Sequence, residues 1–255
     1  MRCPVILSLS LLMVAACNEK RAPAPVKSPP AAAPAPAADE GRGAIEVTVR
    51  FEGTPPKMGL QDRSHDRYCR LSRTKDETVL VAKDGTLRNV IVRISKGIDE
   101  TIEPPEEPVV IDQTKCMFRP RVSVAIENQK VHLLNSDKTM HNVHGFRGQP
   151  PRTIFNLAQI DGGKPIEKKF LDGGEIISLR CDVHPWMASY IAISTHPYWA
   201  LIRDTGPARI ENVPTGKKTV ETWHEVYGFE SIEVDVRAGQ MTKATITYRP
   251  NDTTE

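Results

Sequence analysis

One short loop of the sequence carries three side chains that bind soft metal ions. Cys181, His184 and Met187 supply a thiolate, an imidazole and a thioether within seven residues. A second imidazole, His141, lies in the segment 140–144, which reads MHNVH. Two His, one Cys and one Met are the ligands of a mononuclear electron-transfer copper site, in which the thioether is a weak and distant axial ligand. The residue types therefore predict that these four side chains bind one copper ion.

The alternation of apolar residues predicts the strand that delivers the cysteine. Ile177, Leu179 and Cys181 lie two residues apart, so their side chains point to the same face of a strand that enters the core. About seven or eight short strands are expected within residues 107–195, a density that is typical of a small β-sandwich. This region is the predicted copper domain.

The flanking regions also read as strands, which makes the predicted fold class all-β. Residues 45–51 alternate between apolar and polar side chains, and residues 89–94 form a second apolar run. Further strands are expected at Tyr198–Ile202, Ala208–Glu211, Thr219–His224, Ile232–Val236 and Ala244–Tyr248. Two strands alone would not make a core. We therefore expect one discontinuous sandwich, 43–103 plus 196–250, with the copper domain inserted. Two consecutive, unrelated domains are the alternative.

The N-terminus indicates export. The apolar run from Val5 to Ala16 is too short to span a bilayer comfortably, and it ends in small residues before Cys17. The sequence Val-Ala-Ala-Cys resembles a bacterial lipobox. The resemblance implies a signal peptide over 1–16, lipidation of Cys17 and a location in the cell envelope facing the periplasm, and Asn18 mildly favours the outer membrane. An ordinary signal peptide with an incidental cysteine is the alternative.

Composition adds a tether and excludes nucleic acid. Residues 17–42 are dominated by Ala and Pro, so they predict an extended, disordered linker between the lipid and the folded part. The net charge is +2, and the basic residues are scattered, so nothing indicates a nucleic-acid partner. In an exported chain disulfides persist, and we predict that Cys69 and Cys116 pair. Two buried free thiols are the alternative.

Residues 107–195 resemble a cupredoxin, and within that family they are most similar to amicyanin, through the MHNVH segment and the spacing Cys-x-x-His-x-x-Met. The resemblance implies that Asn142 ties the His141 segment to the Cys181 strand and donates towards the sulfur. It also implies that His184, with Pro185 and Trp186, forms an apolar patch where electrons enter and leave. The partners would be redox proteins that bind transiently, for example a cytochrome or a dehydrogenase.

The flanking strands resemble a carboxypeptidase-regulatory-like (transthyretin-like) β-sandwich, through strand pattern and a Pro-x-Gly turn at 214–216. No chemistry is recognisable in this part.

The sequence leaves open several alternatives to an electron-carrying copper protein. Cys181 and His184 could form half of a zinc site with His141 and His144, although Met187 would then be unexplained. His144 is expected instead to pack or to form hydrogen bonds on the opposite strand face. The sequence shows no His-rich clusters for a second copper centre, so we expect no enzyme activity. A copper-delivery protein, or an envelope interaction module with an incidental metal site, are the competing functions.

Overall fold

The computed structural model describes residues 41–250, and it confirms the all-β fold class. The short 3-10 helix η1 spans Cys69–Leu71. The strands are β1 (Arg42–Phe51), β2 (Val90–Lys96), β3 (Val109–Gln113), β4 (Phe118–Arg119), β5 (Val122–Ile126), β6 (Val131–Asn135), β7 (His141–Arg147), β8 (Arg152–Gln159), β9 (Ile166–Lys168), β10 (Ile176–Arg180), β11 (Ala188–Ser194), β12 (Trp199–Ile202), β13 (Ala208–Pro214), β14 (Gly216–His224), β15 (Gly228–Val236) and β16 (Met241–Tyr248).

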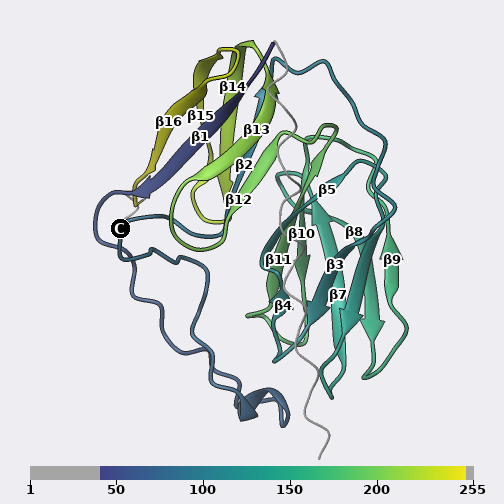
Figure 1. The fold of residues 1–255 in the computed structure, drawn as a ribbon. Helices are drawn as coiled ribbons and strands as arrows, with labels where there is room; N and C mark the ends of the chain where they lie inside the picture. Colours follow the sequence, from purple (N-terminus) through teal and green to yellow (C-terminus); the bar gives the residue numbers. More distant parts are fainter. Residues whose placement is uncertain (1–40, 251–255) are drawn as a thin grey trace, which may run out of the picture. The chain divides into compact units, whose positions relative to one another are not determined.

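Strands from both ends of the described chain form a first sandwich (β1, β2 and β12–β16; Figure 1). One sheet has the order β13-β1-β16, in which β1 runs parallel to β16, and the other has the order β12-β2-β14-β15. Alternate residues of β1 point into the shared core, where Ile45, Val47 and Val49 are fully buried with Val90 and Val92 of β2. The period-2 pattern of the sequence therefore corresponds to one buried face.

A second sandwich contains β3–β11. Its sheets have the orders β5-β11-β10-β7-β8 and β4-β3-β6-β9, and side chains of both sheets meet in one apolar core. Every residue of β11 is buried. Ile191 and Ile193 face the core of this sandwich, whereas Tyr190 and Ala192 belong to a further apolar cluster that includes Ile91 of β2. Strand β11 is thus covered on both faces, which explains the apolar run from Tyr190 to Ile193.

The boundaries of the domains stay a prediction, since the described residues 41–250 fall within one compact unit. The strand pairings that concern these boundaries join segments far apart in the sequence. Strand β2 pairs with β12 and β14, and β1 pairs with β13 and β16, so the chain between β2 and β12 makes up the second sandwich. Strand β1 begins at Arg42, within the predicted tether, because the Arg42 guanidinium is held by Glu100 and by the hydroxyl of Tyr198.

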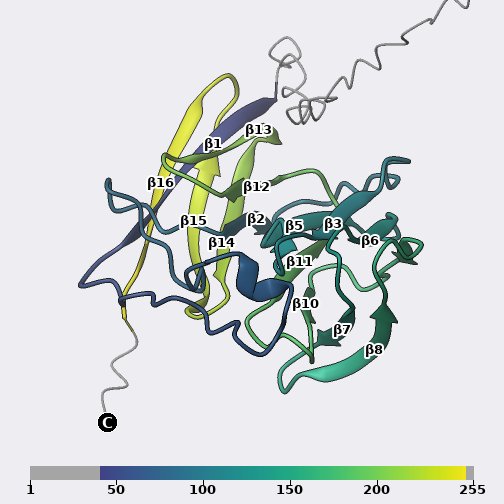
Figure 2. The ribbon, with the colours of Figure 1, turned by 90° about the horizontal axis from the view of Figure 1, so that it is seen from below.

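Residues 57–78, between β1 and β2, have no strand of their own and contain η1 (Figure 2). We call this segment the cap. The predicted pair Cys69 and Cys116 forms a disulfide, with a Cα–Cα distance of 5.6 Å, and this bond ties the cap to the second sandwich next to β4. Lipidation at Cys17, the signal peptide and most of the tether lie outside the described residues. Among residues 41–250, no helix is long and apolar enough to cross a membrane.

Candidate metal centre

Strand β10 delivers Cys181 to the core of the second sandwich. Ile177, Leu179 and Cys181 are each at most 2% exposed and lie in the same apolar cluster, so the parity predicted from the sequence is confirmed. Strand β10 is held between β7 and β11, and its last residue, Arg180, lies opposite His144 and Ala188. The position of the thiol is therefore set by two neighbouring strands.

The two predicted histidine ligands come from different elements. His141 is the first residue of β7, where it pairs with Gln159 at the end of β8. His184 lies in the loop between β10 and β11. The backbone N–H of Met187 donates to the carbonyl of His184 at 2.9 Å, which closes a turn and returns the chain to β11. Backbone pairing thus fixes both residues.

The structure brings His141, Cys181 and His184 together. One ligand atom from each lies within 4.8 Å of the other two, and all three residues are buried. The Nδ1 atoms of the two imidazoles are 2.8 Å apart, and the sulfur of Cys181 is 3.7 Å from Nδ1 of His184. Two imidazole nitrogens and one sulfur therefore converge on one small, water-shielded space.

This convergence fits a cation. The outer Nε2 of each imidazole faces a carboxylate oxygen, which only accepts, so each Nε2 carries a hydrogen atom. Both Nδ1 atoms then direct lone pairs into the same space, and at 2.8 Å they repel unless a proton or a metal ion lies between them. A thiolate with two imidazoles is a donor set that suits copper.

Met187, the predicted axial ligand, lies in the core of the second sandwich. Its side chain is fully buried, three residues after His184, in the apolar cluster that also contains Cys181. A thioether contributes little charge, so a weak axial contact perturbs a metal without fixing its geometry. The structure therefore brings three of the predicted ligands together and buries the fourth in the same core, and the contact of Met187 with a metal stays a prediction.

The charges at the site favour metal binding. Burial raises the pKa of the Cys181 thiol, but the contacts of its sulfur with the imidazoles of His141 and His184 outweigh burial and lower that pKa to about 6. Burial lowers the pKa of His141, but the hydrogen bond to Asp137 and the neighbouring thiolate raise it to about 9. A thiolate is the form of cysteine that binds metals, so the two imidazoles hold the sulfur in its reactive state.

Two carboxylates complete the surroundings of the imidazoles, and neither was predicted. Asp137 Oδ2 lies 3.0 Å from Nε2 of His141, and Asp66 Oδ2 lies 3.2 Å from Nε2 of His184. Asp137 precedes His141 by four residues, a proximity visible in the sequence. Asp66 comes from the cap, and nothing in the sequence pattern connects it to the site. Carboxylates at this position orient a metal-binding imidazole.

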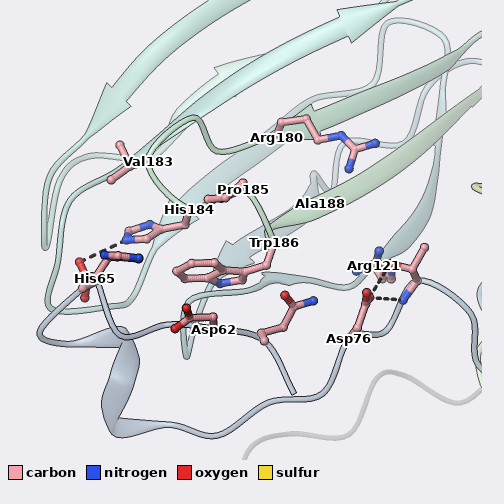
Figure 3. A pocket seen from close by; sticks show the side chains of 13 residues that line it. Asp62, His65, Asp76, Arg121, Arg180, Val183, His184, Pro185, Trp186 and Ala188 are labelled. Atoms are coloured by element: carbon pink, nitrogen blue, oxygen red, sulfur yellow. Dashed lines mark hydrogen bonds and ion pairs between the residues drawn. The ribbon is translucent and has the colours of Figure 1, made fainter. Parts of the chain in front are cut away.

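The resemblance implies that the ring of His184 is exposed where electrons enter and leave, and the structure corrects this expectation. The side chain of His184 is 1% exposed, because Asp66 and the sulfur of Cys69, at 3.6 Å from Nε2, cover that edge. Pro185 is exposed and Trp186 is half-buried. Trp186 and His184 line an open pocket of about 630 Å³, in which Figure 3 shows the indole beside the imidazole. The electron-transfer role of this patch stays a prediction.

Asn142 ties the two segments together, but it does so differently from the prediction. Its side-chain oxygen accepts the backbone N–H of Asp182 at 2.7 Å, which joins the start of β7 to the loop. Its Nδ2 donates to Asn156 and to the carboxylate of Asp182, and not to the sulfur. The backbone of Asn142 supplies the hydrogen bond to the thiolate of Cys181 instead.

The structure separates His144 from the metal-binding group. Its Nδ1 lies 2.9 Å from Asp182, and its Nε2 lies 2.8 Å from the hydroxyl of Thr153. The ring stacks on Phe146. The hydrogen-bonding role predicted for His144 is confirmed, and the zinc alternative lacks its fourth ligand among the described residues because His144 faces away from Cys181.

Comparisons with known proteins add structural neighbours but no sequence family. No family model matches the chain, and no curated protein matches it. The chain is similar to a purple cupredoxin from Nitrosopumilus maritimus, at 19% identity over 34% of this chain and 99% of that protein, with a TM-score of 0.30. It is similar to amicyanin from Paracoccus versutus, at 15% identity over 40% of this chain and 97% of that one, with a TM-score of 0.31.

A copper-containing nitrite reductase from Thermus scotoductus SA-01 is a third structural neighbour. It is 21% identical over 41% of this chain, but the match spans 25% of the reductase, with a TM-score of 0.30. Values this low carry no argument about function. The function is therefore argued from the geometry of the site itself.

Proposed function

We propose that this protein binds one copper ion at His141, Cys181 and His184, with Met187 as the axial ligand, and carries single electrons between redox proteins. The observation that supports this proposal most strongly is the convergence of two Nδ1 atoms and one thiolate in a buried space. When bound, copper supplies a one-electron couple between Cu(I) and Cu(II).

The protein's own residues would keep the ligands in place during this exchange. His141 is fixed by its pairing with Gln159, and Cys181 directly follows Arg180, the last paired residue of β10. The loop that carries His184 is closed by a backbone hydrogen bond. A rigid site needs little rearrangement when the charge of the ion changes, which favours fast electron exchange. Burial also excludes water from the ligands.

The cellular setting belongs to the same proposal. Export, lipidation at Cys17 and residence in the bacterial cell envelope, facing the periplasm, are supported by the N-terminal sequence. The partners are transient redox proteins, such as a cytochrome or a dehydrogenase, and the protein itself transforms no substrate. Small contact areas suit partners that must separate after each transfer.

The competing function is copper delivery, and spectroscopy separates the two. The full-length chain is loaded with Cu(II), and its visible absorption and electron paramagnetic resonance spectra are recorded. An electron carrier should show an intense thiolate-to-copper band and a narrow hyperfine splitting. Cys181→Ser should abolish the band, whereas His144→Gln, which changes a nearby histidine outside the ligand group, should preserve it. A weak, colourless and rapidly exchanging site would contradict the proposal and favour delivery.

A further inference from the structure

Asp137 is held rigidly against the outer nitrogen of His141. Its Oδ2 lies 3.0 Å from Nε2 of His141 and also accepts the backbone N–H of Cys116 at 2.6 Å. Its Oδ1 accepts the backbone N–H of Lys115 at 2.6 Å and the hydroxyl of Tyr68 at 3.3 Å. The side chain is 1% exposed. Four contacts thus leave this carboxylate no freedom to turn away from the imidazole.

Asp66 holds the outer nitrogen of His184 in the same way. Its Oδ2 lies 3.2 Å from Nε2 of His184 and accepts the hydroxyl of Thr139 at 3.3 Å. Its Oδ1 accepts the backbone N–H groups of Tyr68 and Cys69, at 2.7 and 2.6 Å. Asp66 therefore reaches the site only because the cap is folded against the second sandwich.

The disulfide connects the two carboxylates. Asp66 accepts the N–H of Cys69, Asp137 accepts the N–H of Cys116, and these two cysteines are bonded to each other. Tyr68 adds a second link, because its N–H donates to Asp66 and its hydroxyl donates to Asp137. The two carboxylates, the disulfide and Tyr68 form one connected layer behind both imidazoles.

We infer that Asp66 and Asp137 are positioning residues that keep both imidazoles in the tautomer with hydrogen on Nε2 and the Nδ1 lone pair aimed at the ion. A hydrogen bond from the outer nitrogen to a carboxylate fixes the tautomer and makes the inner nitrogen more basic. Two negative carboxylates close to the site also favour Cu(II), the more highly charged state, over Cu(I). The part of this inference that concerns the redox states rests on the proposed function.

The tautomer is tested without any metal. Long-range proton–nitrogen correlation spectra of the wild-type, metal-free protein report which ring nitrogen of each histidine carries hydrogen. The inference expects His184 with hydrogen on Nε2. A His184 ring with hydrogen on Nδ1 alone would overturn it. This result does not depend on whether the protein carries electrons, so the positioning role and the proposed function can fail separately.

The effect on the redox states is tested in the copper-loaded protein with a matched pair of variants. Asp66→Asn removes the charge beside His184 while its oxygen can still accept the N–H groups of Tyr68 and Cys69. Asp62→Asn removes a charge from the same cap, but the Asp62 carboxylate is held by the N–H of Ser64 and contacts neither imidazole. The reduction potential should rise in Asp66→Asn and stay close to the wild-type value in Asp62→Asn. Equal shifts in both variants would show a general charge effect and overturn the inference.

Discussion

The acidity of Cys181 in the metal-free protein measures how strongly the site is organised for a cation. Burial raises the pKa of this thiol from its ordinary value of 9.0, but its contacts with the imidazoles of His141 and His184 lower it to about 6. A decrease of about three units corresponds to about 4 kcal/mol in favour of the thiolate, at roughly 1.4 kcal/mol per unit. His141 carries the balancing positive charge, since its pKa is raised to about 9.

The sign of the resulting pH dependence follows from linkage. The folded pKa of Cys181 lies below its unfolded value, so its contribution to stability is complete above the unfolded pKa of 9.0 and is lost as the pH falls through about 6. His141 behaves in the opposite way, because its contribution is complete below the unfolded pKa of 6.5 and is lost as the pH rises through about 9. Between about pH 6 and 9 the metal-free site holds a thiolate beside an imidazolium.

The assay is a titration of ultraviolet thiolate absorbance, with the spectrum of Cys181→Ser subtracted. We expect a midpoint near pH 6 in the wild-type protein. His141→Gln should move the midpoint up, because it removes the protonated imidazole that stabilises the thiolate. His144→Gln should leave it unchanged, since His144 contacts Asp182 and Thr153 and not the sulfur. A wild-type midpoint near 9, or equal shifts in the two histidine variants, would refute the reasoning.

Two further predictions concern stability. Arg121 and Glu225 form a salt bridge with side chains only 5% and 4% exposed, so Glu225→Gln should lower the free energy of unfolding in urea by about 3–5 kcal/mol, as expected when a buried charge loses its partner. Asp204→Asn removes one partner of the exposed Arg88–Asp204 salt bridge and should lower the free energy of unfolding by less than about 1 kcal/mol. A similar loss of stability in Glu225→Gln and Asp204→Asn would contradict this account. Burial, aided by Arg121, lowers the pKa of His224 to about 4. The unfolded chain therefore binds the proton more readily below pH 6.5, and stability should fall towards pH 4 by up to about 3 kcal/mol. His224→Phe should reduce the difference between the free energies of unfolding measured in urea at pH 7 and at pH 5. An equal difference in the wild type and in the variant would contradict this account.

The sequence was sufficient for those parts of the fold and site that depend on local pattern. Alternation places Ile177, Leu179 and Cys181 on one buried face, and β10 has this geometry. The candidate ligands could likewise be predicted from residue type and spacing, since a cysteine, a histidine and a methionine at these intervals are typical of a metal-binding loop.

The rest depends on contacts between segments that are far apart in the sequence. The sequence of the polar, irregular cap does not predict that Asp66 contacts His184, because a segment without regular secondary structure has no periodic pattern. The position of the cap is set instead by the disulfide to Cys116. The same contact explains the wrong expectation for His184. Its exposure was implied by the resemblance to cupredoxins, and the covering residues come from more than a hundred positions earlier.

The position of the cap changes the role of the first sandwich. No chemistry was recognisable in its strands, yet the cap is the connection between two of them, β1 and β2, so the first sandwich holds both ends of the segment that carries Asp66. Strand β1 is fixed between β13 and β16, and β2 between β12 and β14. Each end of the cap is therefore anchored in a sheet, while its middle is anchored by the disulfide next to the two imidazoles. If the second sandwich were produced alone, His184 would lose Asp66 and half of the disulfide, and its outer nitrogen would face water. The first sandwich is thus a part of the surroundings of the candidate metal centre, because it anchors the segment that closes them.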